Sequence, residues 1–145
     1  MGLTRRRMLA GAGFVTATLA WPLRAAGDEG TAHLVEQLTG KVPVASDRVH
    51  LVIPRSFPNG YTVPLSLAVD SPMTESDHVR SVRVLAPRNP LVEVAALHFT
   101  RSGAPRVETR IRLAEPQDVV AVAEMNDGTL LMTTTWVDVA TNGCT

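Results

Sequence analysis

The sequence predicts an all-β domain, an immunoglobulin-like antiparallel β-sandwich of about seven strands preceded by a short N-terminal helix. Two observations support this class. Apolar residues alternate with polar ones over short runs, and turn-forming residues separate each run from the next. No segment between the runs is long enough for the helical crossover that a parallel sheet requires. The strands should therefore pair as neighbours and pack in two layers around one core.

The helix is predicted from Asp28 to Gly40. Leu34, Val35 and Leu38 fall on one helical face, and Gly40 is a typical helix stop. Together with the linker that follows, this helix is assigned to residues 28–48.

Seven strands are predicted over the rest of the domain. A period of two is clearest at residues 63–69 and 107–113. The other apolar runs lie at residues 49–53, 79–85, 92–99, 118–125 and 129–139. Residues 119–123 are apolar on both faces, so we place this strand in the centre of a sheet, with a turn at residues 126–128 leading into the last strand. The sandwich domain is assigned to residues 49–139.

The first 27 residues have the layout of an export signal. Arg5, Arg6 and Arg7 precede a mildly apolar stretch, and small residues follow from Ala25 to Gly27. The segment Thr4-Arg5-Arg6-Arg7-Met8-Leu9 resembles the twin-arginine export motif, whose passengers cross the membrane already folded. We expect residues 1–27 to be a twin-arginine-type signal peptide and the product to be free in the periplasm. The general secretory route and a permanent anchor are the alternatives.

The charge balance argues against a nucleic-acid binder. The 145-residue chain has 14 basic and 14 acidic residues. Four of the arginines lie in the signal segment, so ten basic groups remain against 14 acidic ones after cleavage. A mildly acidic domain lacks the overall basic balance that would displace counterions from nucleic acid.

Several catalytic and metal-binding classes lack their sequence features. There is no G-x-S-x-G element, no glycine-rich phosphate loop and no paired Cys/His spacing for structural zinc. The chain has one cysteine and four histidines, the same number of each as the His4Cys iron site of superoxide reductases, which also have an immunoglobulin-like sandwich. In that family a histidine ligand closely follows the cysteine, whereas only Thr145 follows Cys144 here. We therefore assign no metal and interpret the histidines as surface residues: His33, His50, His78 and His98. An independent metal or redox enzyme remains a distant alternative.

Cys144 is the only cysteine and the penultimate residue. Residues 140–145 have neither apolar period nor bulk, so we predict a flexible C-terminal arm to which Asn142 and Gly143 contribute flexibility. The five residues from Val139 to Cys144 would reach about 17 Å if extended. An exposed thiol in an oxidising compartment forms adducts, so one that is retained there should have a use. This placement predicts a tethered carrier, whose thiol receives a group in one active site and presents it to the next.

Several segments, in order along the mature chain, resemble those of one known family. They are Val69-Asp70-Ser71-Pro72-Met73-Thr74, the strand His78–Leu85, His98-Phe99-Thr100, Arg110-Ile111-Arg112-Leu113-Ala114, and Val119–Met125 with its Asp127-Gly128 turn. Together with the twin-arginine signal they resemble the SoxY sulfur-carrier proteins of the periplasmic thiosulfate-oxidation system.

This resemblance implies a sandwich domain that forms a heterodimer with a SoxZ-like sandwich subunit. Cys144 would be the covalent attachment site for thiosulfate-derived intermediates, and the chain itself would be no enzyme and need no cofactor. A thiosulfate-coupling haem enzyme would load the thiol, a sulfate-releasing hydrolase would remove sulfate, and a sulfane dehydrogenase would act on the remaining sulfur. No nucleic acid and no stable membrane insertion are expected.

The C-terminal tail departs from the family pattern. The family ends in Gly-Gly-Cys-Gly-Gly, whereas this chain ends in Asn142-Gly143-Cys144-Thr145. Thr145 is bulkier than glycine, and its terminal carboxylate should disfavour the thiolate of Cys144 and slow its loading. A SoxY-like binding or scaffold subunit without carrier work is therefore the alternative function.

Overall fold

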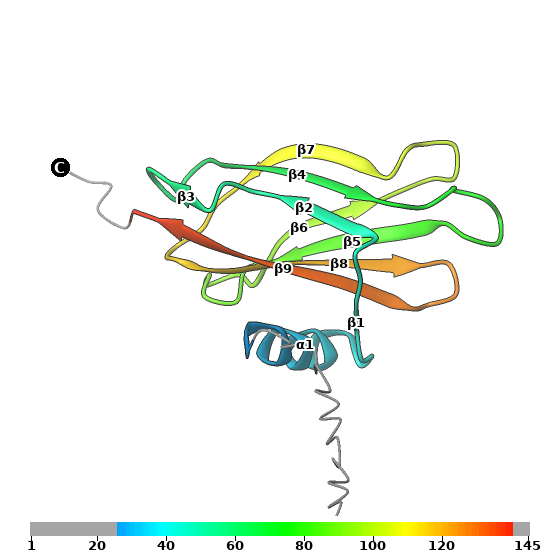
Figure 1. Cartoon of the computed structure of the whole chain (residues 1–145), viewed down its shortest axis with the longest axis horizontal. Coiled ribbons are helices and arrows are strands. Elements are labelled where there is room, and N and C mark those ends of the chain that lie inside the picture. Colours follow the sequence, from blue (N-terminus) through cyan, green and yellow to red (C-terminus); the bar gives the residue numbers. More distant parts are fainter. Residues whose placement is uncertain (1–25, 141–145) are drawn as a thin grey trace, which may run out of the picture.

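The computed structural model describes residues 26–140 as one helix and nine strands (Figure 1). The elements are α1 (Ala26–Thr39), β1 (Val44–Ala45), β2 (Val49–Val52), β3 (Ser56–Phe57), β4 (Val63–Val69), β5 (Val79–Leu85), β6 (Glu93–His98), β7 (Arg106–Ile111), β8 (Gln117–Met125) and β9 (Leu130–Val139). Among these residues, no helix is long and apolar enough to cross a membrane.

The strands form two sheets that pack face to face as an immunoglobulin-like sandwich. The larger sheet has the order β1-β9-β8-β5-β6, with β3 also paired to β9, and the smaller sheet has the order β2-β4-β7. The apolar strand β8 lies between β9 and β5, so the prediction of a central strand is confirmed.

The prediction of seven strands is wrong in number, because the described residues contain nine. All seven predicted runs form strands. The two additional strands, β1 and β3, have two residues each and pair with β9 in parallel rather than antiparallel. A two-residue strand is too short to show alternation. Its position depends on a partner strand more than 80 residues later in the chain.

The main core lies between the two sheets and follows the period-two pattern. The strand β4 alternates strictly between buried and partly exposed residues, with Val63, Leu65 and Leu67 pointing inward. They meet buried side chains of the larger sheet, including Val82 and Val119. Each such side chain contributes about 1.5–3 kcal/mol when it is fully buried, so this interior dominates the stability of the domain.

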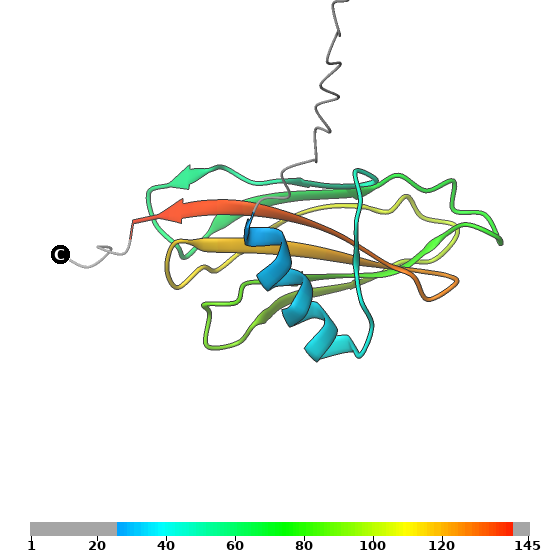
Figure 2. The same ribbon diagram turned by 60° about the horizontal axis from the view of Figure 1, so that its bottom comes forward.

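The helix α1 packs on the outer face of the larger sheet and crosses β8 and β9 (Figure 2). Val35 is fully buried there, in a second apolar cluster with Val120, Val122 and Met132. Leu38 is 49% exposed, so the predicted apolar face is only partly buried. A helix resting on a flat sheet contacts it along a narrow line, and Leu38 falls to one side of that line.

The β8–β9 turn shows how local sequence sets a hairpin. Gly128 has a φ of 85° and its N–H donates to the Met125 carbonyl at 3.0 Å, a conformation that favours glycine. The backbone N–H of Thr129 donates to Asp127 Oδ1 at 2.9 Å, and this hydrogen bond lowers the pKa of the Asp127 carboxyl below its usual value. The turn thus starts β9 in a defined register.

Candidate functional site

The predicted site residues Asn142, Gly143 and Cys144 lie outside the described residues, as does most of the predicted signal peptide. The structure describes the chain up to Ala140. The candidate site is therefore defined by the strand that leads to Cys144 and by the surface around the end of that strand.

The end of β9 is held firmly in the sandwich. Val137 and Val139 point into the core, where they are 0% and 2% exposed. On the edge of the strand, Asp138 N–H donates to the carbonyl of Arg55 at 2.8 Å, and Ala140 N–H donates to that of Phe57 at 3.3 Å. These bonds fix the position from which the terminal residues depart. From Ala140 to Cys144 the chain can span at most about 14 Å.

The loop after β3 is held against this end of the sandwich by a close backbone contact. Leu113 N–H donates to the Gly60 carbonyl at 2.7 Å. A Cβ atom at position 60 would lie 1.9 Å from the Leu113 carbonyl oxygen and 3.6 Å from a methyl of Val139. Glycine is needed here because the backbones approach too closely for any side chain.

We expect Gly60→Ala to lower the free energy of unfolding by about 1–3 kcal/mol, because the backbone has to move to relieve the clash. Urea denaturation followed by circular dichroism measures this loss. Gly103→Ala is the matched control, since a Cβ there meets nothing closer than 3.7 Å. Equal stability of the two variants would contradict the close-packing explanation.

Two turns at the same end are tied together by the fully buried side chain of Gln117. Its Oε1 accepts a hydrogen bond from Arg88 N–H at 2.8 Å, and its Nε2 donates to Asn89 Oδ1 at 2.9 Å and to the Glu115 carbonyl at 3.1 Å. Asn89 Oδ1 also accepts from Ala114 N–H at 2.8 Å. The network joins the turn between β5 and β6 to the segment between β7 and β8 (Figure 1). It gives the end of the sandwich a rigid base.

Two exposed aromatic side chains are each covered by an arginine near this end. The guanidinium carbon of Arg88 lies 5.7 Å from the ring centre of Trp136, and that of Arg112 lies 4.9 Å from that of Tyr61. Both rings are about half exposed. Aromatic and arginine side chains are enriched at protein interfaces, so these pairs are candidates for contacts with partner proteins. Sequence reasoning missed them, because contacts between an arginine and an aromatic residue about 50 positions away leave no local pattern.

The four histidines are placed separately. His50 Nε2 lies 2.7 Å from Asp70 Oδ2, His78 Nδ1 lies 2.8 Å from the Thr74 carbonyl oxygen, and His33 lies beside Gln37 on α1. His98 is exposed at the end of β6. Within residues 26–140, no group of three His, Cys, Asp or Glu side chains is arranged to hold a metal ion.

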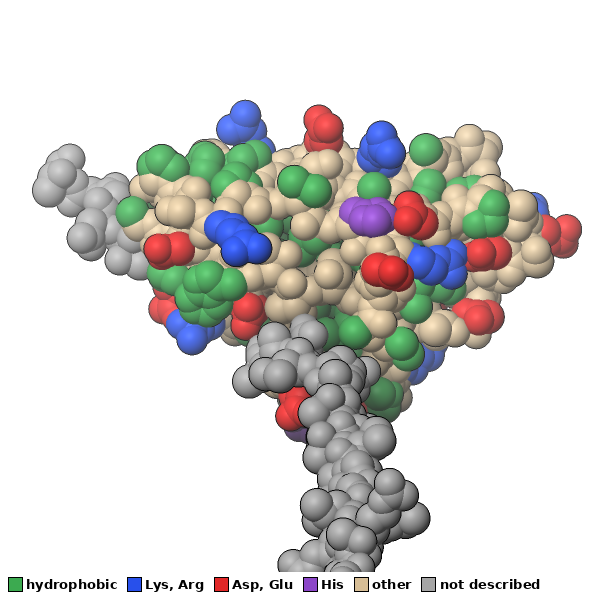
Figure 3. Space-filling model, in the orientation of Figure 1, with side chains coloured by type: hydrophobic (Ala, Val, Ile, Leu, Met, Phe, Trp, Pro, Cys, Tyr) green, Lys and Arg blue, Asp and Glu red, His purple; other side chains and the backbone are tan. Residues whose placement is uncertain are grey.

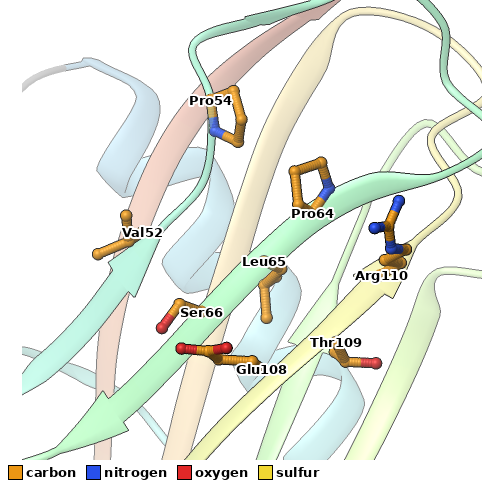
Figure 4. A pocket seen from close by; sticks show the side chains of 8 residues that line it. All are labelled: Val52, Pro54, Pro64, Leu65, Ser66, Glu108, Thr109 and Arg110. Atoms are coloured by element: carbon orange, nitrogen blue, oxygen red, sulfur yellow. The ribbon is translucent and has the colours of Figure 1, made fainter.

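The outer face of the smaller sheet has a shallow hollow of about 450 Å³ (Figure 4). Val52, Pro54 and Pro64 supply apolar surface, while Glu108 and Arg110 supply charge. Ser66 and Glu108 are cross-strand partners in this lining, and no histidine or cysteine is among its described residues. Figure 3 shows acidic and basic side chains interspersed over one face of the molecule.

The fold and this end of the molecule define the class of protein: a two-sheet immunoglobulin-like sandwich whose single thiol follows the last strand. Residues 35–144 match the family model described as "Sulfur oxidation protein SoxY". The match covers more than half of the chain, and Cys144 is its last residue. The protein belongs to the SoxY family.

Solved structures with the same fold include SoxY itself. The sulfur carrier protein SoxY from Chlorobium limicola f thiosulfatophilum superposes with a TM-score of 0.62 at 22% identity, covering 78% of this chain and 98% of that one. The superoxide reductase (neelaredoxin) from Ignicoccus hospitalis has a TM-score of 0.59 at 15% identity, with 70% and 98% covered. A putative superoxide reductase from Thermotoga maritima has a TM-score of 0.58 at 19% identity, with 68% and 94% covered. At these sequence identities the structural similarities show a shared fold alone. No curated protein matches the chain in sequence.

Proposed function

We propose that this protein is a periplasmic sulfur-carrier subunit that holds thiosulfate-derived intermediates covalently on Cys144 during thiosulfate oxidation. The observation that carries the proposal is the SoxY family match, which runs from residue 35 to Cys144 itself. Cys144 is the single cysteine of the sequence, so no other residue could form a sulfur–sulfur bond.

The loading step is an oxidation. The Cys144 thiol loses its proton, its sulfur bonds to the outer sulfur of thiosulfate, and two electrons pass to a thiosulfate-coupling haem enzyme. The product is Cys–S–S–sulfonate. Water then attacks the sulfonate sulfur in a sulfate-releasing hydrolase, which frees sulfate and one proton and leaves a persulfide on Cys144. A sulfane dehydrogenase would oxidise that remaining sulfur.

The role of the sandwich in this scheme is to present the thiol, while the partner enzymes supply the chemistry. The hydrogen bonds of β9 to Arg55 and Phe57 hold the chain up to Ala140, and the following four residues bring Cys144 up to about 14 Å from that point. An arm of residues 140–145, with Asn142 and Gly143 before the thiol, would let Cys144 enter an active site while the domain stays outside.

We infer the partners and the location from the family and from the predicted export signal. We place a SoxZ-like sandwich subunit beside the domain as a heterodimer, and we place the complex in the periplasm. Residues 1–27 would direct export of the folded chain by the twin-arginine route and then be removed. Residues 28–48 and 49–139 would form the helix with its linker and the sandwich of the mature carrier.

The test is intact-mass spectrometry of the purified mature protein. After incubation with thiosulfate and the coupling haem enzyme, we expect the chain to gain one thiosulfate unit, localised to the C-terminal peptide containing Cys144. A reducing agent should remove the added mass, because it cleaves the sulfur–sulfur bond. A chain that stays unmodified, beside a SoxY control that is loaded, would contradict the carrier function.

A scaffold function is the second candidate, and the tail sequence favours it. Asn142 and Thr145 stand where the family has glycines around the carrier cysteine. A bulkier tail should enter narrow active sites less readily. In that case the protein would assemble with the same partners without receiving sulfur.

A further inference from the structure

A groove crosses the outer face of the larger sheet, beyond the area that α1 covers. It consists of a hollow of about 510 Å³ over β5 and the end of β6 and a smaller hollow of about 170 Å³ beside the end of α1. The two hollows share Ser81, Arg83 and Glu124 in their linings, so they are parts of one continuous depression. We call this depression the basic groove.

Positive groups predominate in the larger hollow. Its arginines are Arg80, Arg83 and Arg101, and its histidines are His78 and His98. Glu124 is the single carboxylate of that lining, and Lys41 Nζ lies 3.6 Å from its Oε1. Arg83 likewise has a partner in Glu93, at 3.6 Å. Both nearby carboxylates are thus matched by a cation, and the remaining positive groups are in excess.

Arg80 and Arg101 form this excess, and His98 lies in the same lining. Their side chains are exposed, and within the described part of the chain none has a hydrogen bond or an ion pair. The mature domain as a whole is mildly acidic. Positive charge gathered in a concave surface of such a domain produces a local potential that attracts anions.

Ser81 adds a polar group at the floor of the groove. It pairs with His98 on β6 and Glu124 on β8, lines both hollows, and is 9% exposed. Its hydroxyl makes no hydrogen bond with any described residue. A serine hydroxyl can both donate and accept a hydrogen bond, so it can bind a polar group that enters the groove.

The groove has more room than one small oxoanion would fill. Its larger hollow alone is about 510 Å³, whereas one water occupies about 30 Å³ in the liquid. Arg80 and Arg83 line it from β5 and Arg101 lines it from the segment after β6, so it presents several cations to an entering chain. An extended chain with several carboxylates matches the groove better, because arginine binds carboxylates through two parallel hydrogen bonds.

We propose that the basic groove docks an extended acidic segment of a partner protein. Glu124 lies opposite Leu130 at the start of β9, while the residues leading to Cys144 depart from its other end. Along the strand this separation is about 30 Å, more than twice the reach of about 14 Å from Ala140 to Cys144. A partner can therefore hold the domain by the groove while the end with the thiol stays accessible.

The test uses a fluorescein-labelled hexaglutamate peptide and the mature protein, with binding followed by fluorescence anisotropy. We expect saturable binding that weakens as salt is raised, and no binding of a hexaglutamine peptide. Arg80→Glu with Arg101→Glu should weaken hexaglutamate binding about tenfold or more. Ser81→Ala should weaken it severalfold, because one hydrogen bond is lost. Thermal unfolding of each variant checks that the fold is retained.

Arg55→Glu with Arg110→Glu is the matched control, because it changes the net charge equally and neither residue lines the groove. We expect this control to bind hexaglutamate nearly as well as the wild type. An equal loss in both double variants would overturn the proposal, since attraction would then depend on overall charge. If sulfate or thiosulfate binds the groove as tightly as the peptide does, the groove is a small-anion site and the proposal is wrong. Loading of Cys144, measured by mass, is a separate experiment that neither result affects.

Discussion

Cys144→Ser is expected to abolish thiosulfate-dependent sulfur loading completely. The serine hydroxyl is similar in size to the thiol but cannot form a sulfur–sulfur bond, and the sequence contains no second cysteine to replace it. If the protein is a carrier, thiosulfate oxidation by a system reconstituted with its partner enzymes should also stop. The measurements are the intact mass of the variant after incubation and the rate of sulfate release.

The variant should fold as well as the wild type, because the main core is built by strands that end at Val139. Equal midpoints of urea denaturation would therefore assign the loss to the missing thiol. Thiosulfate oxidation at the wild-type rate with Cys144→Ser would contradict the carrier function and favour the scaffold alternative. The reconstituted system should also be measured with the protein left out. Oxidation that proceeds with Cys144→Ser but stops without the protein would establish the scaffold role directly.

Gln117→Met is expected to lower the free energy of unfolding by about 2–4 kcal/mol. Methionine has a similar length but cannot replace the hydrogen bonds that Gln117 makes with Arg88 N–H, Asn89 Oδ1 and the Glu115 carbonyl. Polar groups left without a partner in a buried site retain the full cost of their desolvation. Urea denaturation of the variant and the wild type measures the difference.

Gln37→Met is the control for this change, because Gln37 is exposed on α1 and, among the described residues, its side chain hydrogen-bonds only with that of His33, at 3.2 Å. We expect it to alter stability by less than about 0.5 kcal/mol. A loss below about 1 kcal/mol for Gln117→Met would show that water or a rearranged turn satisfies the network. Hydrogen exchange of the Arg88 amide distinguishes these cases, since it should accelerate when its acceptor is removed.

The long strands and the helix could be predicted because their signals are local. Alternation at residues 63–69 marks β4 in any context, and Gly40 ends α1 as expected. The strands β1 and β3 could not be predicted. Each has two residues and exists only because β9 offers a free edge for pairing. The partial exposure of Leu38 likewise depends on the angle at which α1 crosses the sheet.

The same division holds for function. The proposed role of Cys144 rests on local sequence, since a lone thiol after the last predicted strand and a predicted export signal can both be recognised without a structure. The basic groove depends on tertiary structure. Arg80 and Arg101 are 21 positions apart and become neighbours of one hollow only through the pairing of β5 with β6. Hydrophobic periodicity and composition report on residues that are close in the sequence. A surface built from several strands depends on long-range strand pairing, which no local pattern encodes.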